Sequence, residues 1–239
     1  VNSYDPNLDS KGGFRTDING SADSFSKLEL PAAVTNYIIA LRTNSVRITH
    51  PADLLEAKMQ VKDENGTPVE LQSGVGKAEL AQIVDSFYGT SVKNLEGLIN
   101  VNTASTRVLA ALPGMDEPLA EAIASGRRST GPEKRTTIAW LFEEGVLDAD
   151  HFKKIAPFIC ARSFQFTFHV VGYSLPSRKF RALEVGIDIA DGKRSVTYLR
   201  DLTRLGLPLE ISETSDSAKV AKIWPGVKQG WNRKRTTHG

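Results

Sequence analysis

Apolar residues recur at helical spacing over the first two thirds of the chain. In "LPAAVTNYIIALR" (30–42), Pro31 suits a first helical turn, and one apolar stripe follows it. This stripe consists of Val34, Tyr37, Ile38 and Leu41. Similar stripes predict further short helices over 49–59, 76–89, 102–112, 116–126, 138–145 and 148–159. Residues 31–162 are therefore predicted to form an all-helical domain, preceded by a polar N-terminal segment at 1–30.

The pattern changes to strands at Phe164. In "FQFTFHVVGY", the residues Phe166, Phe168 and Val170 point to one side, and His169 points to the other. The stretch "ALEVGIDIADGKRSVTYLRDL" (182–202) predicts two more strands around a turn at Asp191-Gly192. Residues 163–209 are thus predicted to be antiparallel strands, and 210–239 a loose C-terminal tail. The predicted fold class is α+β.

One side of these strands is apolar and needs a cover. Leu183, Val185, Ile187 and Ile189 share a face. An apolar sheet face is usually buried against a helix, and no helix pattern follows the strands. The cover is therefore expected from earlier in the chain, from an N-terminal segment outside this sequence, or from a partner.

Composition and charge restrict the function classes. The chain has 239 residues and a formal net charge of +2, so no global basic field attracts a phosphate backbone. The single cysteine, Cys160, lies in the apolar run "KKIAPFICARS" and is interpreted as a small buried hydrophobe. The sequence has no run of 18 apolar residues and no signal peptide, and its polar start at Val1 is compatible with a soluble fragment.

The stretch "INVNTASTRVLAALPGM" (99–115) predicts a helix that ends at a tight Pro113-Gly114 bend, and a second helix follows. We interpret residues 99–126 as a helix-hairpin-helix. Such motifs bind DNA when hairpin glycines expose backbone N–H groups to phosphate, in the common pattern Leu-Pro-Gly-hydrophobic-Gly. Here the second glycine is Asp116, whose carboxylate repels a phosphate. Arg127 and Arg128 are candidate backbone contacts, but a solvated helix end is favoured.

The segments "INVNTAS", "VLAALPGM" and "AEAIASGRR" resemble the helix-hairpin-helix of two families. One is the competence DNA receptor type, and the other is the minor pseudopilin K family of type II secretion systems. The strands "FTFHVVGYS" and "RALEVGIDIADGKRSVTYLRD" are similar to the closing strands of the second family, whereas competence receptors usually end soon after the hairpin. The resemblance covers roughly residues 30–202 and is most specific over Asn100 to Gly114.

This resemblance implies a pilin-like head, built from residues 1–30 and the strands of 163–209, that carries an inserted helical domain. The implied function is structural: a minor pseudopilin at the tip of a periplasmic pseudopilus that promotes its assembly and protein export. The implied partners are other minor pseudopilins, with anchoring to the inner membrane by an N-terminal helix outside this sequence and no nucleic acid. Within the motif, we expect Asn102 to cap a helix and Asn100 to tie the incoming strand to a neighbouring turn. A DNA-binding protein of the competence type is the alternative.

Calcium is the one candidate cofactor, because members of the resembled family can bind it. Asp5, Asn7 and Asp9 alternate as at the start of a calcium loop, but an EF-hand pattern would need Gly and Glu where Ser10 and Thr16 stand. A second set has the same ambiguity: Asp17, Asn19 and Asp23. A polar turn is favoured in both places, and no residue is assigned as a metal ligand.

No pattern in the sequence predicts an enzyme. Nucleophile-elbow, phosphate-loop and dinucleotide motifs do not occur. The histidines have neither metal-ligand spacing nor catalytic neighbours; they are His50, His151, His169 and His238. Trp140 and Phe142 are interpreted as packing residues rather than a ligand site. No catalytic, cofactor-binding or metal residue is therefore predicted.

Overall fold

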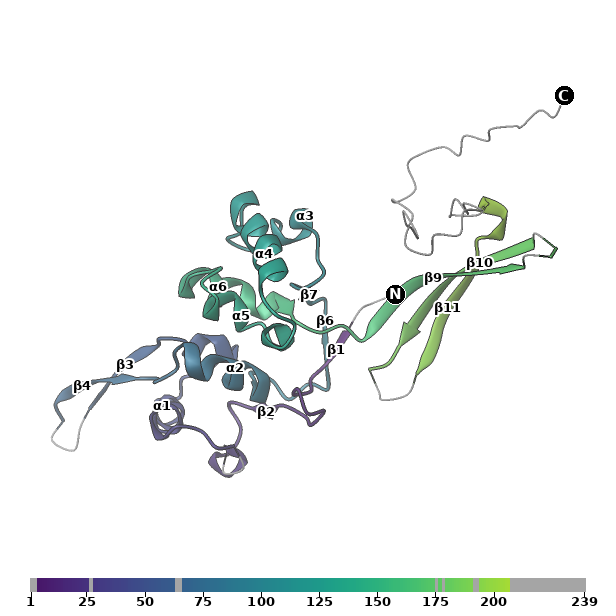
Figure 1. Cartoon of the computed structure of the whole chain (residues 1–239). Coiled ribbons are helices and arrows are strands. Elements are labelled where there is room, and N and C mark those ends of the chain that lie inside the picture. The colour runs from purple at the N-terminus through teal and green to yellow at the C-terminus, as the bar shows by residue number, and fades with distance from the viewer. Residues whose placement is uncertain are drawn as a thin grey trace. The chain divides into compact units, whose positions relative to one another are not determined.

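The computed structural model describes residues 4–25, 28–62, 66–174, 176–177, 179–190 and 194–206. The chain divides into two compact units (Figure 1). Unit 1 comprises residues 1–165 and 189–193, and unit 2 comprises residues 166–188 and 194–239. Helices and small sheets are mixed within the chain, so the predicted α+β class is confirmed.

Unit 1 combines short helices with very short strands. Its α-helices are α1 (Ala32–Thr43), α2 (Lys77–Ser86), α3 (Thr106–Leu109), α4 (Glu117–Ser129), α5 (Trp140–Glu143) and α6 (Ala149–Ile155). Its 3-10 helices are η1 (Ala22–Phe25), η2 (Pro51–Leu54), η3 (Lys134–Thr136) and η4 (Ala156–Phe158). Its strands are β1 (Tyr4–Pro6), β2 (Thr16–Asp17), β3 (Lys58–Lys62), β4 (Pro68–Gln72), β5 (Phe87–Tyr88), β6 (Asn94–Glu96), β7 (Ile99–Asn100) and β8 (Ile159–Cys160).

Strand pairs fasten distant parts of unit 1 to one another. Strand β1 pairs with β6 in antiparallel fashion, and β2 pairs with β5 in parallel fashion. The parallel pair β7–β8 joins Ile99 to Ile159 across the whole helical segment between them. In contrast, β3 and β4 form a local antiparallel hairpin that extends away from the helices (Figure 1).

The predicted apolar stripes form the core of unit 1. In α1, all four residues of the predicted stripe are buried. In α2, Leu80 and Ile83 are fully buried, as is Phe87 directly after the helix. The packing roles predicted for Trp140 and Phe142 are confirmed, because both side chains lie in this core. Asp148 caps α6 by accepting a hydrogen bond from His151 N at 2.8 Å.

The helix predicted over 49–59 is wrong beyond Leu54. The His50 side chain caps the short helix η2, but the chain then turns at Glu56, whose φ is 50°. From Lys58 the backbone bonds instead to β4, with Met59 opposite Leu71. A ladder to a neighbouring strand thus replaces the helical bonds that the local pattern predicted. Part of the turn expected at Asn65-Gly66 lies outside the described residues.

Residues 31–162 are not all helical, because strands β3 to β8 lie within them. Two glycines of this segment allow close packing. A Cβ atom on Gly89 would lie 2.0 Å from the carbonyl oxygen of Thr49, so only glycine fits there. Helix α4 continues through Gly126 to Ser129, and a Cβ at Gly126 would meet Val146 at 2.8 Å.

Unit 2 is built on one three-stranded sheet with the order β11-β10-β9. Its strands are β9 (Gln165–Ser174), β10 (Lys179–Asp188) and β11 (Ser195–Asp201), and the 3-10 helix η5 (Thr203–Leu205) follows. Strands β10 and β11 are antiparallel, with Val185 opposite Leu199 and a bulge after Gly186. The predicted strands are confirmed, whereas the turn at Asp191-Gly192 and the 210–239 tail lie outside the described residues.

In the part of the chain that the structure describes, no helix is both long enough and apolar enough to cross a bilayer.

Adjacent isoleucines in α1 provide a matched test of the core. Ile38 is 0% exposed and Ile39 is 42% exposed. We expect Ile38→Ala to lower the free energy of unfolding by about 2–5 kcal/mol, because it removes buried methylenes and leaves a cavity. Ile39→Ala should change it by less than about 1 kcal/mol. Urea unfolding of both variants measures the difference, and equal losses would place the core elsewhere.

Candidate functional site

The bend between α3 and α4 is tight and capped on both sides. Ser105 caps α3, where its side chain accepts a hydrogen bond from Val108 N at 3.4 Å. Gly114 has a φ of 73°, and Met115 N donates to Leu112 O at 3.1 Å. The Asp116 carboxylate then accepts from Leu119 N at 2.9 Å and caps α4. The carboxylate therefore occupies the helix N-terminus where a phosphate would otherwise bind.

Two asparagines tie this segment to the end of unit 1. Asn102 does not cap a helix, as the sequence led us to expect; its Nδ2 donates at 2.8 Å to both Arg135 O and Ala161 O. Asn100 Oδ1 accepts from Asn102 N at 2.8 Å, and Asn100 Nδ2 donates to Ser163 Oγ at 2.7 Å. Val101 N also donates to Cys160 O at 2.9 Å. We call this set of bonds between residues 99–102 and 159–163 the closing tie.

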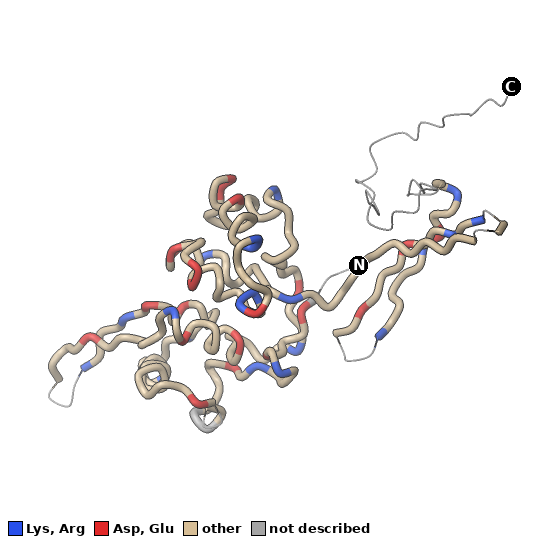
Figure 2. The backbone as a smooth tube through the Cα atoms, viewed as in Figure 1, with Lys and Arg blue, Asp and Glu red and all other residues tan. Residues whose placement is uncertain are grey.

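The two arginines in the last turn of α4 have partners within the fold. Arg127 Nη2 donates to Ala104 O at 2.8 Å, and burial lowers the pKa of its guanidinium. Arg128 lies 3.6 Å from Glu121 in an exposed ion pair. Acidic and basic positions are interspersed along the backbone (Figure 2). Both side chains thus already have protein partners, a backbone carbonyl for Arg127 and a carboxylate for Arg128.

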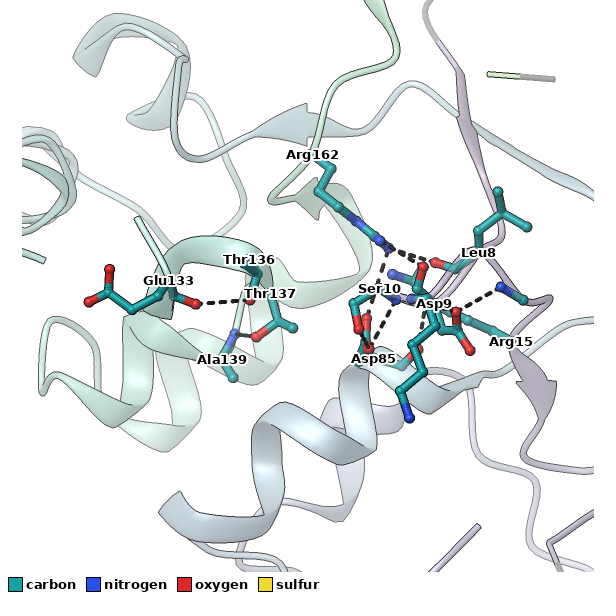
Figure 3. Close-up of polar contacts among 12 residues, drawn as sticks. Leu8, Asp9, Ser10, Arg15, Asp85, Glu133, Thr136, Thr137, Ala139 and Arg162 are labelled. Carbon is teal, nitrogen blue, oxygen red and sulfur yellow. Dashed lines mark hydrogen bonds and ion pairs between the residues drawn. The ribbon is translucent and has the colours of Figure 1, made fainter. Parts of the chain in front are cut away.

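A guanidinium follows the closing tie and reaches the N-terminal segment. Arg162 Nη1 donates to Asp9 O at 2.8 Å, and its Nη2 donates to Leu8 O at 2.6 Å (Figure 3). The same Nη2 lies 3.9 Å from Asp85 Oδ1. Arg162 lies between β8 and β9 in the sequence. Its side chain therefore connects the segment that follows β8 to the N-terminal segment of unit 1.

Asp85 at the end of α2 holds the same segment from another side. Its Oδ2 accepts hydrogen bonds from Ser10 N at 3.1 Å and from Ser10 Oγ at 2.6 Å (Figure 3). Its backbone carbonyl accepts from Arg15 Nε at 3.2 Å. Charge-assisted hydrogen bonds of this kind are among the stronger polar contacts in proteins.

Beneath these contacts lies a small cavity of about 30 Å³, which Asp5, Arg15, Cys160 and other residues line. Asp5 is only 5% exposed, and its Oδ1 has no hydrogen-bond partner. Burial raises the pKa of Asp5, against the opposing effects of Arg15 and Arg162. Burial also raises the pKa of the Cys160 thiol to about 12, so this cysteine stays protonated. The volume is of the size that holds a water molecule rather than a substrate.

The predicted calcium-loop residues have separate tasks here. The Asp9 carboxylate accepts from Lys11 N and Gly13 N, both at 2.8 Å, in a polar turn. The Asn7 side chain donates to Val92 O at 3.0 Å, and Asp5 lines the cavity. Within the described ranges, no group of three or more His, Cys, Asp or Glu residues is placed to hold a metal ion. Calcium binding stays a prediction.

The second predicted set also makes structural bonds. Asp17 Oδ1 accepts from Asn19 N at 2.9 Å. The Asn19 side chain bonds to both the backbone N–H and the carbonyl of Ile48. The side chain of Asp23 lies outside the described residues.

The described histidines are spread over different elements. His50 is buried and its Nδ1 accepts from Ala52 N at 3.1 Å, so it helps η2 to begin, as predicted. His151 pairs with Asp148 on α6. His169 lies 3.6 Å from Glu184 in unit 2. His238 lies outside the described residues.

The sheet of unit 2 presents an apolar face without a covering element among its described residues. His169 pairs with Glu184 on one face, so strand alternation places Phe168 and Leu183 on the other. We call this second face the apolar sheet face; it consists of Phe166, Phe168, Val170, Leu183, Val185 and Leu199. Phe168 is 42% exposed and Leu199 is 62% exposed. Apolar side chains that are exposed together on one sheet face are typical of a surface that another element or a partner covers.

The comparison with protein families matches part of the chain. Residues 99–146 match the family described as type II secretion system (T2SS), protein K. The resemblance recognised from the sequence is confirmed over this segment. We call residues 99–146 the protein K segment; it contains Asn100, Asn102, the α3–α4 bend and α5. No curated protein and no solved structure matches the chain.

Sequence reasoning did not identify the contacts made by Arg162 and Asp85. The only local signal is a charged residue beside the apolar run that ends in "FICARSF". The partners of Arg162 are Leu8 and Asp9, which lie 154 and 153 residues away in the sequence. They accept through backbone carbonyls, which any residue type could supply.

Asn102→Asp tests the closing tie with a nearly isosteric change. The carboxylate cannot donate to Arg135 O and Ala161 O, and it would face both carbonyl oxygens. We expect the free energy of unfolding to fall by at least about 2 kcal/mol in denaturant titrations. The control is Asn44→Asp, at an exposed residue that donates to Ala40 O, where the loss should stay below about 1 kcal/mol. Equal losses would mean that the tie contributes little.

His50 predicts a pH dependence of stability. Burial lowers its pKa to about 4 in the folded protein, from 6.5. The unfolded chain therefore binds more protons between these pH values, and stability falls as the pH decreases from 6.5 toward 4. His50→Asn keeps a cap acceptor but does not titrate. We expect unfolding free energies at pH 6.5 and 5 to differ less in the variant, by roughly 1–2 kcal/mol; parallel profiles would contradict this origin.

Proposed function

We propose that the chain is a structural minor pseudopilin of the protein K type that acts at the tip of a type II secretion pseudopilus. The observation that carries this proposal is the match of residues 99–146 to the protein K family. In this role the chain helps to start pseudopilus assembly and thereby promotes protein export. It works on the periplasmic side of the bacterial inner membrane.

The site geometry supports a structural role. The polar side chains of the protein K segment bond to backbone atoms of the same unit, as Asn102 and Arg127 do. The buried Asp5 carboxyl and the half-buried Cys160 thiol line a cavity of about 30 Å³.

The apolar sheet face supports a pilin-like head for unit 2. Phe166 and Phe168 of β9 stand exposed beside Leu183 and Val185 of β10. Such a face is stabilised when a helix packs on it. We propose that an apolar helix preceding residue 1 covers the apolar sheet face, and that the same helix would anchor the protein in the membrane. Full burial of such a side chain contributes about 1.5–3 kcal/mol, and covering the exposed part of these half-buried side chains would contribute a corresponding fraction.

The DNA-binding alternative finds less support. Asp116 occupies the N-terminus of α4, and Arg127 and Arg128 contact protein atoms. A duplex would have to displace these contacts and approach a carboxylate. We therefore propose that α3, the bend and α4 (residues 105–129) pack within unit 1 rather than bind DNA.

The secretion role predicts binding to partner heads and no binding to DNA. We expect the purified chain to elute as a larger complex in size-exclusion chromatography when it is mixed with the soluble heads of the other minor pseudopilins of the same system. In a mobility-shift assay at low salt, where phosphate contacts are strongest, a duplex should migrate unchanged.

The controls separate the two hypotheses. A major pseudopilin head, which is not a tip subunit, serves as the negative control for complex formation. Separate elution from every minor pseudopilin head would contradict the proposed role. A salt-dependent duplex shift would favour the competence-type alternative.

A further inference from the structure

The segment between Asp5 and Arg15 lies over unit 1 with few apolar anchors. We call it the N-terminal strap. Phe14 is 67% exposed and Leu8 is half-buried, whereas Ile18, just beyond the strap, is 0% exposed. Apolar burial supplies most of the free energy that holds a segment in place, so the strap depends on polar contacts to an unusual degree.

These polar contacts fall into two groups. At the start of the strap, β1 pairs with β6, and Asn7 bonds to Val92 O and Lys93 O. In its middle, Arg162 binds the carbonyls of two consecutive residues, and Asp85 binds Ser10 twice. The middle group comes from α2 and from the segment after β8. It therefore fastens the strap to two separate parts of the folded unit.

The strap also adjoins the cavity described above. Asp5 belongs to the strap, and Cys160 and Arg162 belong to the segment beneath it; all three line the same space. Lifting the strap would expose the buried Asp5 carboxyl and would widen solvent access to the half-buried Cys160. It would leave the apolar contacts of α1, α2 and α5 in place, since none of these helices contains strap residues.

We propose that the Arg162 side chain holds the N-terminal strap closed, and we call it the latch. When its guanidinium loses the hydrogen bonds to the carbonyls of Leu8 and Asp9, the strap opens as a local unit while the helical core stays folded. Asp85 holds the strap at a second point by accepting hydrogen bonds from Ser10, and we call this contact the second catch. The strap precedes Ile18 in the sequence. A force applied to the chain N-terminal to the strap would therefore act on the Arg162 contacts before it acts on the core at Ile18.

Hydrogen exchange followed by mass spectrometry of the full chain tests the latch. In Arg162→Ala, we expect peptides that cover residues 5–15 to exchange at least about tenfold faster than in the wild type, because charge-assisted bonds are lost. Peptides that cover α2 and α6 should exchange as before. Arg162→Lys, which keeps the charge but loses the two-pronged geometry, should give an intermediate rate. The matched control is Arg128→Ala, which removes an arginine from an exposed ion pair and should leave the strap protected.

Two results would overturn the latch. Unchanged exchange in residues 5–15 of Arg162→Ala would mean that the β1–β6 pairing holds the strap alone. Faster exchange throughout α2 and α6 would mean that Arg162 supports the whole unit and does not act as a latch.

The single cysteine gives a second readout without engineering. We expect Asp85→Asn, which weakens the second catch without changing a neighbour of the thiol in sequence, to speed the reaction of Cys160 with a thiol reagent by several-fold at constant pH. An unchanged rate in this variant would show that the strap does not control access to this thiol.

Discussion

Unit 1 depends on the need of buried polar groups for partners. Residues 99–102 and 159–163 meet side by side, and each supplies what the other lacks: Val101 N donates to Cys160 O, and Asn102 donates to Ala161 O. A buried N–H or C=O without a partner costs about 1–3 kcal/mol, so neither segment is stable there alone. The closing tie therefore fixes both ends of the helical segment between them, which includes the protein K segment.

The same stretch of chain serves the unit on two sides. Cys160 and Ala161 complete the closing tie, and Arg162 then reaches Leu8 and Asp9 of the N-terminal strap. Directly afterwards the chain continues into β9. Residues that are neighbours in the sequence thus bind both the protein K segment and the N-terminal strap, and β9 begins directly after them. Such a junction fixes the ends of a large helical segment.

The sequence predicts the elements whose signal is local. The apolar stripe of α1 and the strand β9 can both be read from adjacent residues, and the structure confirms them. The two-residue strands such as β7 and β8 have too few residues to show a period, so no local pattern predicts them. The stretch from Lys58 was misassigned because its pairing with β4 overrides a weak helical pattern.

The polar contacts of the site were harder to predict. Asn102 has the composition of a helix cap, and its observed acceptors lie 33 and 59 residues away. A side-chain amide has the same local preferences in both roles, so the sequence cannot distinguish them. The family match draws attention to this asparagine, and only the folded chain shows what it binds.

Native-state hydrogen exchange at the amide of Val101 tests the closing tie most directly, because this N–H donates to Cys160 O within it. If the tie holds the unit together, this amide exchanges only through global unfolding, with the same free energy of opening as the slowest amides of α2. An opening free energy about 2 kcal/mol or more below that of α2 would show that the tie opens on its own and does not close the unit.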